Sequence, residues 1–489
     1  MTESVAEVPY LQRPRIAVVG LGVVSSLGHQ VMPAWNNLIN GETGVRDIRD
    51  SHLGPYQRVM ATKIGAPVVG FELMNNPLFQ GKYTNPDGKP VNVAKEKKNF
   101  HRSSDMGLEA AYQAIGHGET GAGLLLPDSL QIDPAVVAHD EVGVYMASGL
   151  AGGDALIDAQ DKIDVELRNN LGEEVVEAYL EYLRVRQQAL GLSELTEDEI
   201  RELTRGQVRP YHMQQSLYGR PAEIISLLTQ AKAFEKMSSA ECAASTEAIA
   251  DAADQIMLGR AKIVIAGGTE AAMLPPEILA FERHKGAVSA SDDHLRTPNP
   301  LDKNRTGFVF GEGAAVIVLE ELGHAAARGA HIYAELIGWG TSADAHDPVE
   351  PDPRGIKVSF TRALRMAGLN AAEISNAYVN LHVPGTPADV GEASAFTDML
   401  EPEQTVGFNG TKGQTGHALG GVGALETIFT TLAIEKGIVP ASVHMTDPED
   451  IVSKYPTVMG EPIEADVEIG IKNSSGFGGH NATLILKKY

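Results

Sequence analysis

Residues 237–268 read MSSAECAASTEAIADAADQIMLGRAKIVIAGG and contain a turn, a helix and a strand in succession. Small and apolar residues recur at helical spacing over 246–259, which predicts a helix that packs deeply in a core. The β-branched run at 262–268 ends in two glycines, a pattern typical of a buried strand. The segment therefore predicts a helix-and-strand unit of an α/β protein.

The same alternation extends outward in both directions along the chain. Further buried strands are predicted at 16–20, 141–148, 314–321, 377–382 and 482–488, and further helices at 103–116 and 360–369. Strands that alternate with helices indicate an α/β fold. GLGVVS at 20–25 matches only part of a dinucleotide fingerprint. A tight strand-to-helix turn is therefore favoured there over NAD binding.

Composition excludes several classes of protein. Of 489 residues, 43% are apolar and 21% charged, the balance of an ordinary globular chain. A net charge of −24 argues against a general nucleic-acid binder and against adsorption to anionic membranes. One cysteine permits neither an internal disulfide nor a cysteine-based zinc site. The polar N-terminus and the lack of a long apolar run predict a soluble cytoplasmic protein without a targeting segment.

Residues 154–215 differ from the rest because they are charged, helical in period and almost free of strand signals. Thr196 and Glu199 form a capping-box pattern, so a helix is expected to begin near residue 197. We interpret the segment as a helical insertion. Two interpretations of this segment remain open: a surface embellishment, and a lid or interface element over the site.

The only thiol, Cys242, lies between a polar turn and the predicted helix. A helix N-terminus carries partial positive charge and lowers a thiol pKa, which favours a nucleophile over a buried small hydrophobe. His382 ends a predicted strand, and His417 lies in a glycine-rich loop before a helix. A thiol and two imidazoles suit acyl transfer through a thioester, although either histidine alone could be structural.

Seven blocks of sequence together resemble the β-ketoacyl-acyl-carrier-protein synthases of the thiolase superfamily, most closely the elongating condensing enzymes. The blocks are RIAVVGLGVVSSLG, ECAAS, AGGTEAA, LDKNRTGFVFGEGAAVIVLEE, VNLHVPGTPAD, TKGQTGHALGGVGALE and NSSGFGGHN. The resemblance covers roughly 14–150 and 235–489. It implies a thiolase-like five-layered αβαβα fold built from two similar halves, normally a homodimer, with a heterodimer also open.

The expected domain organisation follows from this resemblance. We expect an N-terminal tail at 1–13, a half that carries the cysteine at 14–325, and a half that carries both histidines at 326–489. The helical insertion at about 154–215 belongs to the first half.

The resemblance implies roles for residues at matching positions. Cys242 matches the nucleophile that accepts the acyl group. His382 and His417 match the pair that supports malonyl decarboxylation and holds the thioester carbonyl. Lys412 and Glu426 match the charged pair that orders the histidine loop. The implied reaction is acyl transfer to the cysteine, decarboxylation of malonyl-carrier to an enolate, and Claisen condensation to a β-ketoacyl-carrier product.

A second glycine-rich loop places Phe477 between glycines. By resemblance, its ring matches a gate, and its backbone N–H and that of Cys242 match the oxyanion hole. From the residues alone, a tight turn with an anchoring ring is the alternative. The resemblance implies no metal and no cofactor of the chain's own, because phosphopantetheine arrives on the acyl carrier protein.

Three places depart from the family's pattern. Glu241 stands where a small residue is usual, and a carboxylate beside a thiol raises the thiol pKa. The turn from His382 to Thr386 reads HVPGT, so one of two hydroxyls expected near the malonyl carboxylate is missing. His480 replaces a small polar residue after the GFGG run. These departures put decarboxylation and full activation of the thiol in question.

Carrier docking on so acidic a chain requires a local basic patch. Lys95, Lys97, Lys98 and Arg102 lie within eight residues, just before the predicted helix from residue 103, where the family meets its carrier. A solvated charged turn is the alternative interpretation of this run.

Two other functions remain open beside the condensing enzyme in fatty acid or polyketide-type elongation. One is an acyltransferase or priming enzyme that does not decarboxylate malonyl groups. The other is a non-catalytic subunit that sets chain length in a heterodimer. A nucleotide-dependent oxidoreductase is the least favoured, and the sequence specifies neither the acyl chain nor the pathway.

Overall fold

The computed structural model describes residues 13–51, 53, 60–80, 82–84, 90–92, 101–149, 218–284 and 286–489. The expected insertion at 154–215, and Lys95, Lys97 and Lys98 of the basic run, lie outside the described residues. Among the described residues, no helix is long and apolar enough to cross a membrane.

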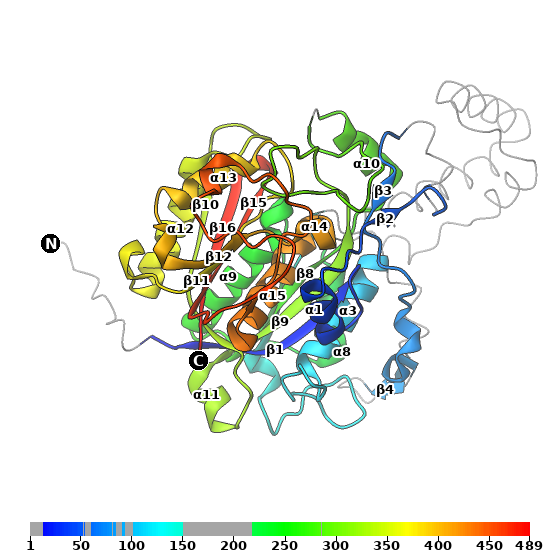
Figure 1. Ribbon diagram of the computed structural model, residues 1–489. Helices are drawn as coiled ribbons and strands as arrows, with labels where there is room; N and C mark the ends of the chain where they lie inside the picture. The colour runs from blue at the N-terminus through cyan, green and yellow to red at the C-terminus, as the bar shows by residue number, and fades with distance from the viewer. Residues whose placement is uncertain are drawn as a thin grey trace, which may run out of the picture.

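Ten strands form one mixed sheet with two arms (Figure 1). The arms meet at β1 (Ile16–Ser25) and β10 (Ala334–Ala343), which pair antiparallel over three residue pairs. Outward from β1 lie β9 (Glu312–Glu321), β8 (Ile263–Ala271), β6 (Val142–Ala147) and β7 (Phe234–Ser238). Outward from β10 lie β16 (His480–Lys487), β15 (Ile469–Gly476), β11 (Ala377–Asn380) and β12 (Thr405–Asn409).

The two arms repeat one topology. In each, the first two pairings outward from the centre are antiparallel and the last two are parallel. A repeated order of this kind is what two similar halves produce.

Helices lie between the arms and on both outer faces. The helices α9 (Ala244–Met257) and α15 (Val422–Lys436) run through the middle of the molecule, where α9 contacts β8 and β16 and α15 contacts β9 and β15. On the outer face of the β1 arm lie α3 (Arg102–Ile115) and α8 (Arg220–Thr229); α12 (Pro353–Ala367) and α13 (Asp389–Thr397) cover the β10 arm. The expected five-layered α/β fold is confirmed.

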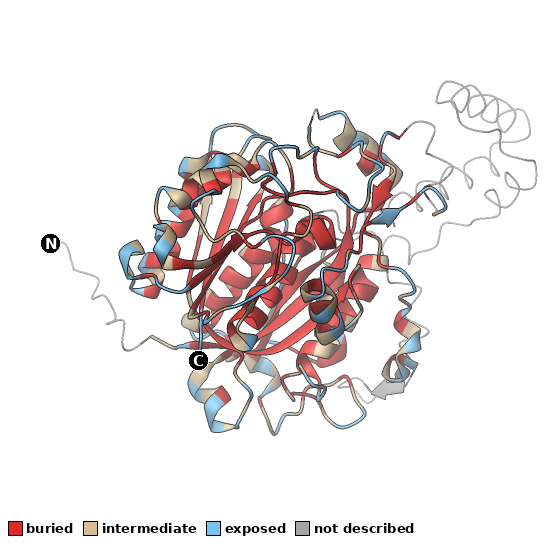
Figure 2. Ribbon diagram, viewed as in Figure 1, coloured by how far each residue is buried: buried red, intermediate tan, exposed pale blue. Residues whose placement is uncertain are grey.

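The central helices owe their burial to small and apolar residues. Nearly all of α15 is buried, as are Ala244, Ala248 and Ala252 of α9 (Figure 2). Their side chains join those of both arms in one apolar cluster, and burial of apolar surface is the main favourable term in folding. The N-terminal ends of both helices, which follow Cys242 and His417 in the chain, therefore lie in the centre of the molecule.

The tight turn expected at 20–25 is wrong, because β1 continues without a break to Ser25. Gly20 and Gly22 serve helix packing instead. A Cβ on Gly22 would lie 1.8 Å from the carbonyl oxygen of Ala110 in α3, so only glycine lets α3 approach this strand.

Other predicted boundaries differ by a few residues. The helix expected at 360–369 begins at Pro353, because Asp352 caps it by accepting a hydrogen bond from the backbone N–H of Arg354. The strand expected at 377–382 ends at Asn380, so His382 lies in the loop that follows.

Short elements complete the described chain. They are α1 (Val31–Ile39), α10 (Pro275–Glu282), α11 (Leu322–Ala327), α14 (Lys412–Thr415) and the strand pairs β2 (Arg46–Asp47) with β3 (Ile64–Gly65), β4 (Lys82–Thr84) with β5 (Pro90–Asn92), and β13 (Ile438–Val439) with β14 (Ile463–Glu464).

Candidate active site

Cys242 lies in a single 3-10 turn (Glu241–Ala243) immediately before α9. The turn packs against the loop after β15. A Cβ on Gly476 would lie 3.1 Å from the backbone nitrogen of Cys242 and 2.8 Å from the carbonyl oxygen of Ala240. Because Gly476 has no side chain, the backbone just before Phe477 can lie directly against the backbone of Cys242.

His382 is fixed through its backbone by a buried carboxylate. Glu392 on α13 accepts hydrogen bonds from the backbone N–H groups of His382 (2.7 Å) and Val383 (2.8 Å). The side-chain amide of Asn473 also donates to Glu392, at 2.6 Å. Three donors on one carboxylate set the start of the HVPGT turn.

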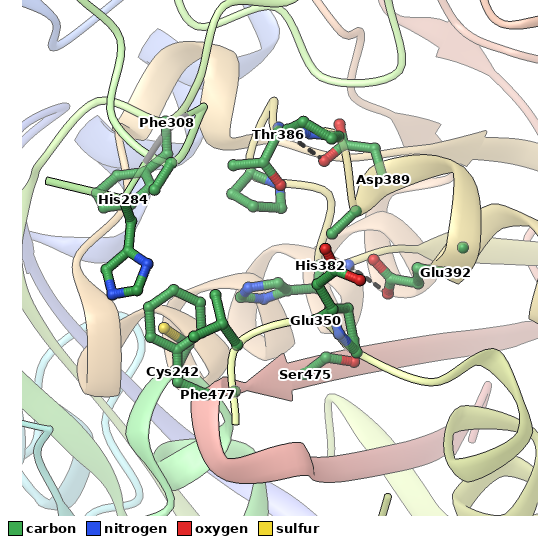
Figure 3. Close-up of a pocket in the computed structure, with 18 of the residues that line it drawn as sticks. Cys242, His284, Phe308, Glu350, His382, Thr386, Asp389, Glu392, Ser475 and Phe477 are labelled. Atoms are coloured by element: carbon green, nitrogen blue, oxygen red, sulfur yellow. Dashed lines mark hydrogen bonds between the residues drawn. The ribbon is translucent and has the colours of Figure 1, made fainter. Parts of the chain in front are cut away.

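His417 lies between α14 and α15, and its Nε2 is 3.1 Å from Sγ of Cys242. Its ring packs edge-on against those of His382 and Phe308, with centroids 5.1 and 5.2 Å apart. The reactive atoms of Cys242, His382 and His417 all lie within 4.8 Å of one another. Three residues distant in the sequence thus converge on one point, and Figure 3 shows two of them, Cys242 and His382, beside the same cavity.

Burial decides the charge of all three groups. Burial, and after it the positive charge of Lys412, holds the pKa values of His382 and His417 well below the usual histidine range. Both imidazoles are therefore neutral at pH 7. Burial, and next the carboxylate of Glu241, raises the pKa of Cys242 to about 12. The expected lowering of this pKa is wrong, because desolvation and the charge of Glu241 outweigh the opposing effect of Lys412.

Lys412 and Glu426 form a fully buried ion pair beneath the histidines. Nζ of Lys412 lies 2.8 and 2.9 Å from the two carboxylate oxygens and donates to the carbonyl oxygen of His382 at 2.5 Å. Thr411 also donates to Glu426, at 3.2 Å. The pair connects the helix after His417 to the loop that carries His382.

Two further charged residues of this network, Glu392 and Lys472, were missed by sequence reasoning. Lys472 lies in β15 with no exposed surface, and its Nζ is 3.1 Å from Glu426. The signal was a lysine inside the apolar strand IGIKNSSG. Glu392 gave no such signal, because an acidic residue near a helix N-terminus is common.

The three groups open into a cavity of about 610 Å³. Phe281, Phe308 and Phe477 form an aromatic wall, with the Phe477 ring stacked on Phe281 at 5.7 Å. Thr386 and Pro384 also line this cavity, and Thr386 lies next to Asp389 (Figure 3). The cavity is mostly apolar and reaches the thiol, which suits an acyl chain bound as a thioester.

The departures from the family pattern lie close to the thiol. Glu241 has a positive φ of 47°, a conformation that costs a side chain energy and suits glycine. Burial raises the pKa of Glu241, and the nearby His480 opposes that shift. The two unusual residues thus lie within electrostatic reach of each other.

Of the expected docking residues, only Arg102 is described. It begins α3, and its guanidinium binds both carboxylate oxygens of Glu312 at 2.9 and 3.0 Å. About 39% of the Arg102 side chain stays exposed.

The donor set of the site also fits a metal ion. One thiol and two imidazoles within 4.8 Å are ligand types that zinc accepts. In the described part of the chain this is the one such cluster of three or more groups, and it coincides with the candidate catalytic residues.

Comparison with known proteins identifies relatives along the whole chain. The family descriptions "Beta-ketoacyl synthase, N-terminal domain" and "Beta-ketoacyl synthase, C-terminal domain" match residues 186–325 and 333–446. A Synechocystis protein named 3-oxoacyl-[acyl-carrier-protein] synthase 2 is 30% identical, covering 98% of this chain and 99% of its own length. The Vibrio harveyi protein of the same name is 30% identical with the same coverage.

Solved structures agree with this result. The ishigamide ketosynthase/chain length factor superposes with a TM-score of 0.75 at 26% identity, over 98% of this chain and all of its own. A β-ketoacyl synthase from Burkholderia phymatum superposes with a TM-score of 0.74 at 24% identity, over 97% of this chain and all of its own, a likeness of fold alone.

Proposed function

This chain belongs to the β-ketoacyl synthase family, as its sequence blocks predict, and we propose that it catalyses decarboxylating condensation of acyl groups carried by an acyl carrier protein. The product is a β-ketoacyl-carrier thioester. The observation that carries the proposal is the 3.1 Å approach of His417 Nε2 to Cys242 Sγ, with His382 beside it in a buried cavity.

Acyl transfer comes first. The neutral imidazole of His417 takes the thiol proton of Cys242 as the sulfur attacks the acyl-carrier carbonyl, as a general base does. The tetrahedral intermediate collapses, the carbon–sulfur bond to the carrier breaks, and the departing thiolate takes the proton from His417. The backbone N–H groups of Cys242 and Phe477 stabilise the oxyanion, a role supported by the close approach of Gly476 to the cysteine.

Malonyl-carrier then reacts in the emptied site. The neutral imidazole of His382 donates a hydrogen bond to its thioester carbonyl as the bond to the carboxylate breaks. His417 donates a second one after its remaining proton has moved from Nδ1 to Nε2 by exchange with solvent. CO₂ leaves, and the bond's electron pair forms an enolate. The enolate carbon attacks the acyl group on Cys242 and releases its thiolate, which takes a proton from solvent and returns to the resting thiol. Imidazoles with lowered pKa values donate without being a source of acid that would quench the enolate.

Lys412 and Glu426 position rather than react. The ammonium of Lys412 holds the carbonyl of His382 and both oxygens of Glu426. The ion pair therefore fixes the two histidine loops relative to each other. In this proposal Thr386, which lines the cavity, binds the malonyl carboxylate.

The partners and organisation follow from the same proposal. The partner is an acyl carrier protein whose phosphopantetheine enters the cavity, with docking by Arg102 and the lysines at 95, 97 and 98. The enzyme needs no cofactor of its own and works as a homodimer in the cytoplasm. The repeated topology of the two arms supports halves at 14–325 and 326–489.

Intact mass spectrometry tests the reaction. Wild type and Cys242→Ala are exposed to a panel of acyl-carrier thioesters and then to malonyl-carrier. Acyl mass on wild type alone, followed by its loss as CO₂ and β-ketoacyl-carrier form, is the expected result. Absence of acylation with every chain contradicts the proposal and favours a non-catalytic chain-length subunit.

One observation favours a second candidate, a priming acyltransferase. Pro384 lines the cavity beside His382 and offers no hydroxyl to a malonyl carboxylate. Stable acylation of Cys242 without CO₂ release is the outcome that selects this function. Pro384→Thr, which adds a hydroxyl at that position, is then expected to start CO₂ release.

A further inference from the structure

Lys472 places a second positive charge beneath the two histidines. It has no exposed surface, and its Nζ lies 3.1 Å from Oε2 of Glu426. The same ammonium donates to the carbonyl oxygen of Asn473. Glu426 therefore pairs with two ammonium groups, those of Lys412 and Lys472, although one lysine is enough to neutralise its charge. The reaction proposed above uses only Lys412.

Glu392 is the carboxylate that the extra charge balances. It is buried, holds the backbone of His382 and Val383, and accepts from Asn473, the neighbour of Lys472 in β15. Burial raises the pKa of Glu392, and the charge of Lys472 acts against that rise. An uncompensated buried charge is strongly destabilising, so two buried carboxylates require two buried cations.

We propose that Lys472 is a positioning residue, whose charge lets Glu392 and Glu426 hold the loops of His382 and Lys412 while both imidazoles stay neutral. The proposal rests on the proposed function for its consequence in catalysis. Lys472 is not among the residues that line the cavity, so it acts through its neighbours. Burial lowers the pKa of Lys472 to about 8, while Glu426 and Glu392 hold it up.

The test must consider every charged group around Lys472. These are Glu426 from α15, Lys412 from α14, Glu392 from α13, the two histidines from their loops, and Glu241 and Glu270, which act on the thiol. Lys472→Met keeps the shape of the side chain and leaves this set with one more net negative charge. The pKa values of His382 and His417 are then expected to rise, because Lys472 lowers both of them. A protonated His417 cannot accept the thiol proton.

The experiment measures the rate of Cys242 alkylation by iodoacetamide against pH, with intact mass as the readout. In wild type the alkylation rate falls at low pH, where acid protonates His417. This fall is the acidic limb of the pH profile. In Lys472→Met we expect that acidic limb to move up by about one pH unit, because removal of a nearby charge shifts a pKa by that order. Lys472→Arg keeps the charge and is expected to retain the wild-type limb. Lys488→Met, which removes an exposed lysine paired with Asp466, is the matched control.

An unchanged limb in folded Lys472→Met overturns the proposal and leaves Lys472 a packing role only. If the Met variant does not fold, Lys472→Gln takes its place, because an amide still donates to Glu426 without a charge. Alkylation needs no carrier substrate, so failure of wild type to release CO₂ would contradict the proposed function while a shifted limb still supports the role of Lys472.

Discussion

Sγ of Cys242 and Nε2 of His417 lie 3.1 Å apart with both side chains buried. Burial raises the pKa of Cys242 to about 12 and holds that of His417 well below the usual range. The pair therefore rests as a neutral thiol beside a neutral imidazole, not as a thiolate–imidazolium pair. Proton transfer must accompany attack on the thioester, so the rate of acylation depends on His417 as a base.

The two histidines are expected to act mainly in different steps, His417 in acylation and His382 in CO₂ release. His417→Ala removes the base beside the thiol and should slow acylation of Cys242 by about 10²- to 10⁴-fold. His382→Ala leaves that contact intact and should lower CO₂ release much more than acylation. Single-turnover mass spectrometry measures the first step, and trapped labelled CO₂ measures the second. Equal loss of acylation in both variants would contradict this division.

The condensation rate is expected to be insensitive to pH between about 8 and 6.5. Both imidazoles have pKa values lowered well below 6.5, so acid protonates them only below that range. Protonated imidazole cannot accept the thiol proton, and the rate then falls. A pH profile in buffers of constant ionic strength checks this, and a midpoint at or above 6.5 would contradict the lowered pKa values.

Removal of the charge on Glu241 is expected to activate the thiol. After burial, Glu241 is the largest contributor to the raised pKa of Cys242. Glu241→Gln should therefore lower that pKa and speed alkylation by iodoacetamide at pH 8, by several-fold. Glu241→Gly should do the same and also relieve the positive φ of 47°. Slower alkylation in both variants would mean that Glu241 assists the cysteine.

The sequence indicated which residues gather at the candidate site better than it indicated their electrostatics. Cys242, His382 and His417 each lie in a turn or loop next to an element, and a layered α/β fold can bring such positions together. The pKa of Cys242 moved in the opposite direction because its depth in the core depends on α9, α15 and both arms of the sheet, which no local pattern contains.

Lys472 and Gly22 illustrate the same limit. A lysine in a strand is normally assigned to a solvent face, and only the packing of β15 against α15 shows that this one is buried. Gly22 looked like a turn residue, because the sequence near it does not reveal that α3 lies against it. In both cases the contacting residue belongs to another layer of the fold, Glu426 of α15 for Lys472 and Ala110 of α3 for Gly22.

Chelation is expected to leave the reaction unchanged. The proposed steps use only protein groups, so dialysis against EDTA should not lower the condensation rate. Added zinc should inhibit, because the thiol and the two imidazoles within 4.8 Å offer it three ligands. Loss of activity on EDTA treatment, restored by zinc, would contradict the thioester mechanism and assign the three residues to a metal.

Gly476→Ala is expected to damage catalysis without removing any side chain of the site. A methyl group at this position would lie 2.8 Å from the carbonyl oxygen of Ala240 and 3.1 Å from the backbone nitrogen of Cys242. The two loops must separate, and the backbone N–H groups of Cys242 and Phe477 then no longer converge on one oxyanion. Loss of one such donor costs about 10²- to 10³-fold in kcat.

Gly118→Ala is the control for this variant, since a Cβ there meets no atom within 4 Å. Alkylation by iodoacetamide forms no tetrahedral oxyanion, so it separates the two explanations for a slow Gly476→Ala enzyme. Slow condensation with near-normal alkylation is the result that the oxyanion role requires. Equal loss in both assays would show that the methyl group displaces Cys242 itself, because only then does the thiol lose its contact with His417.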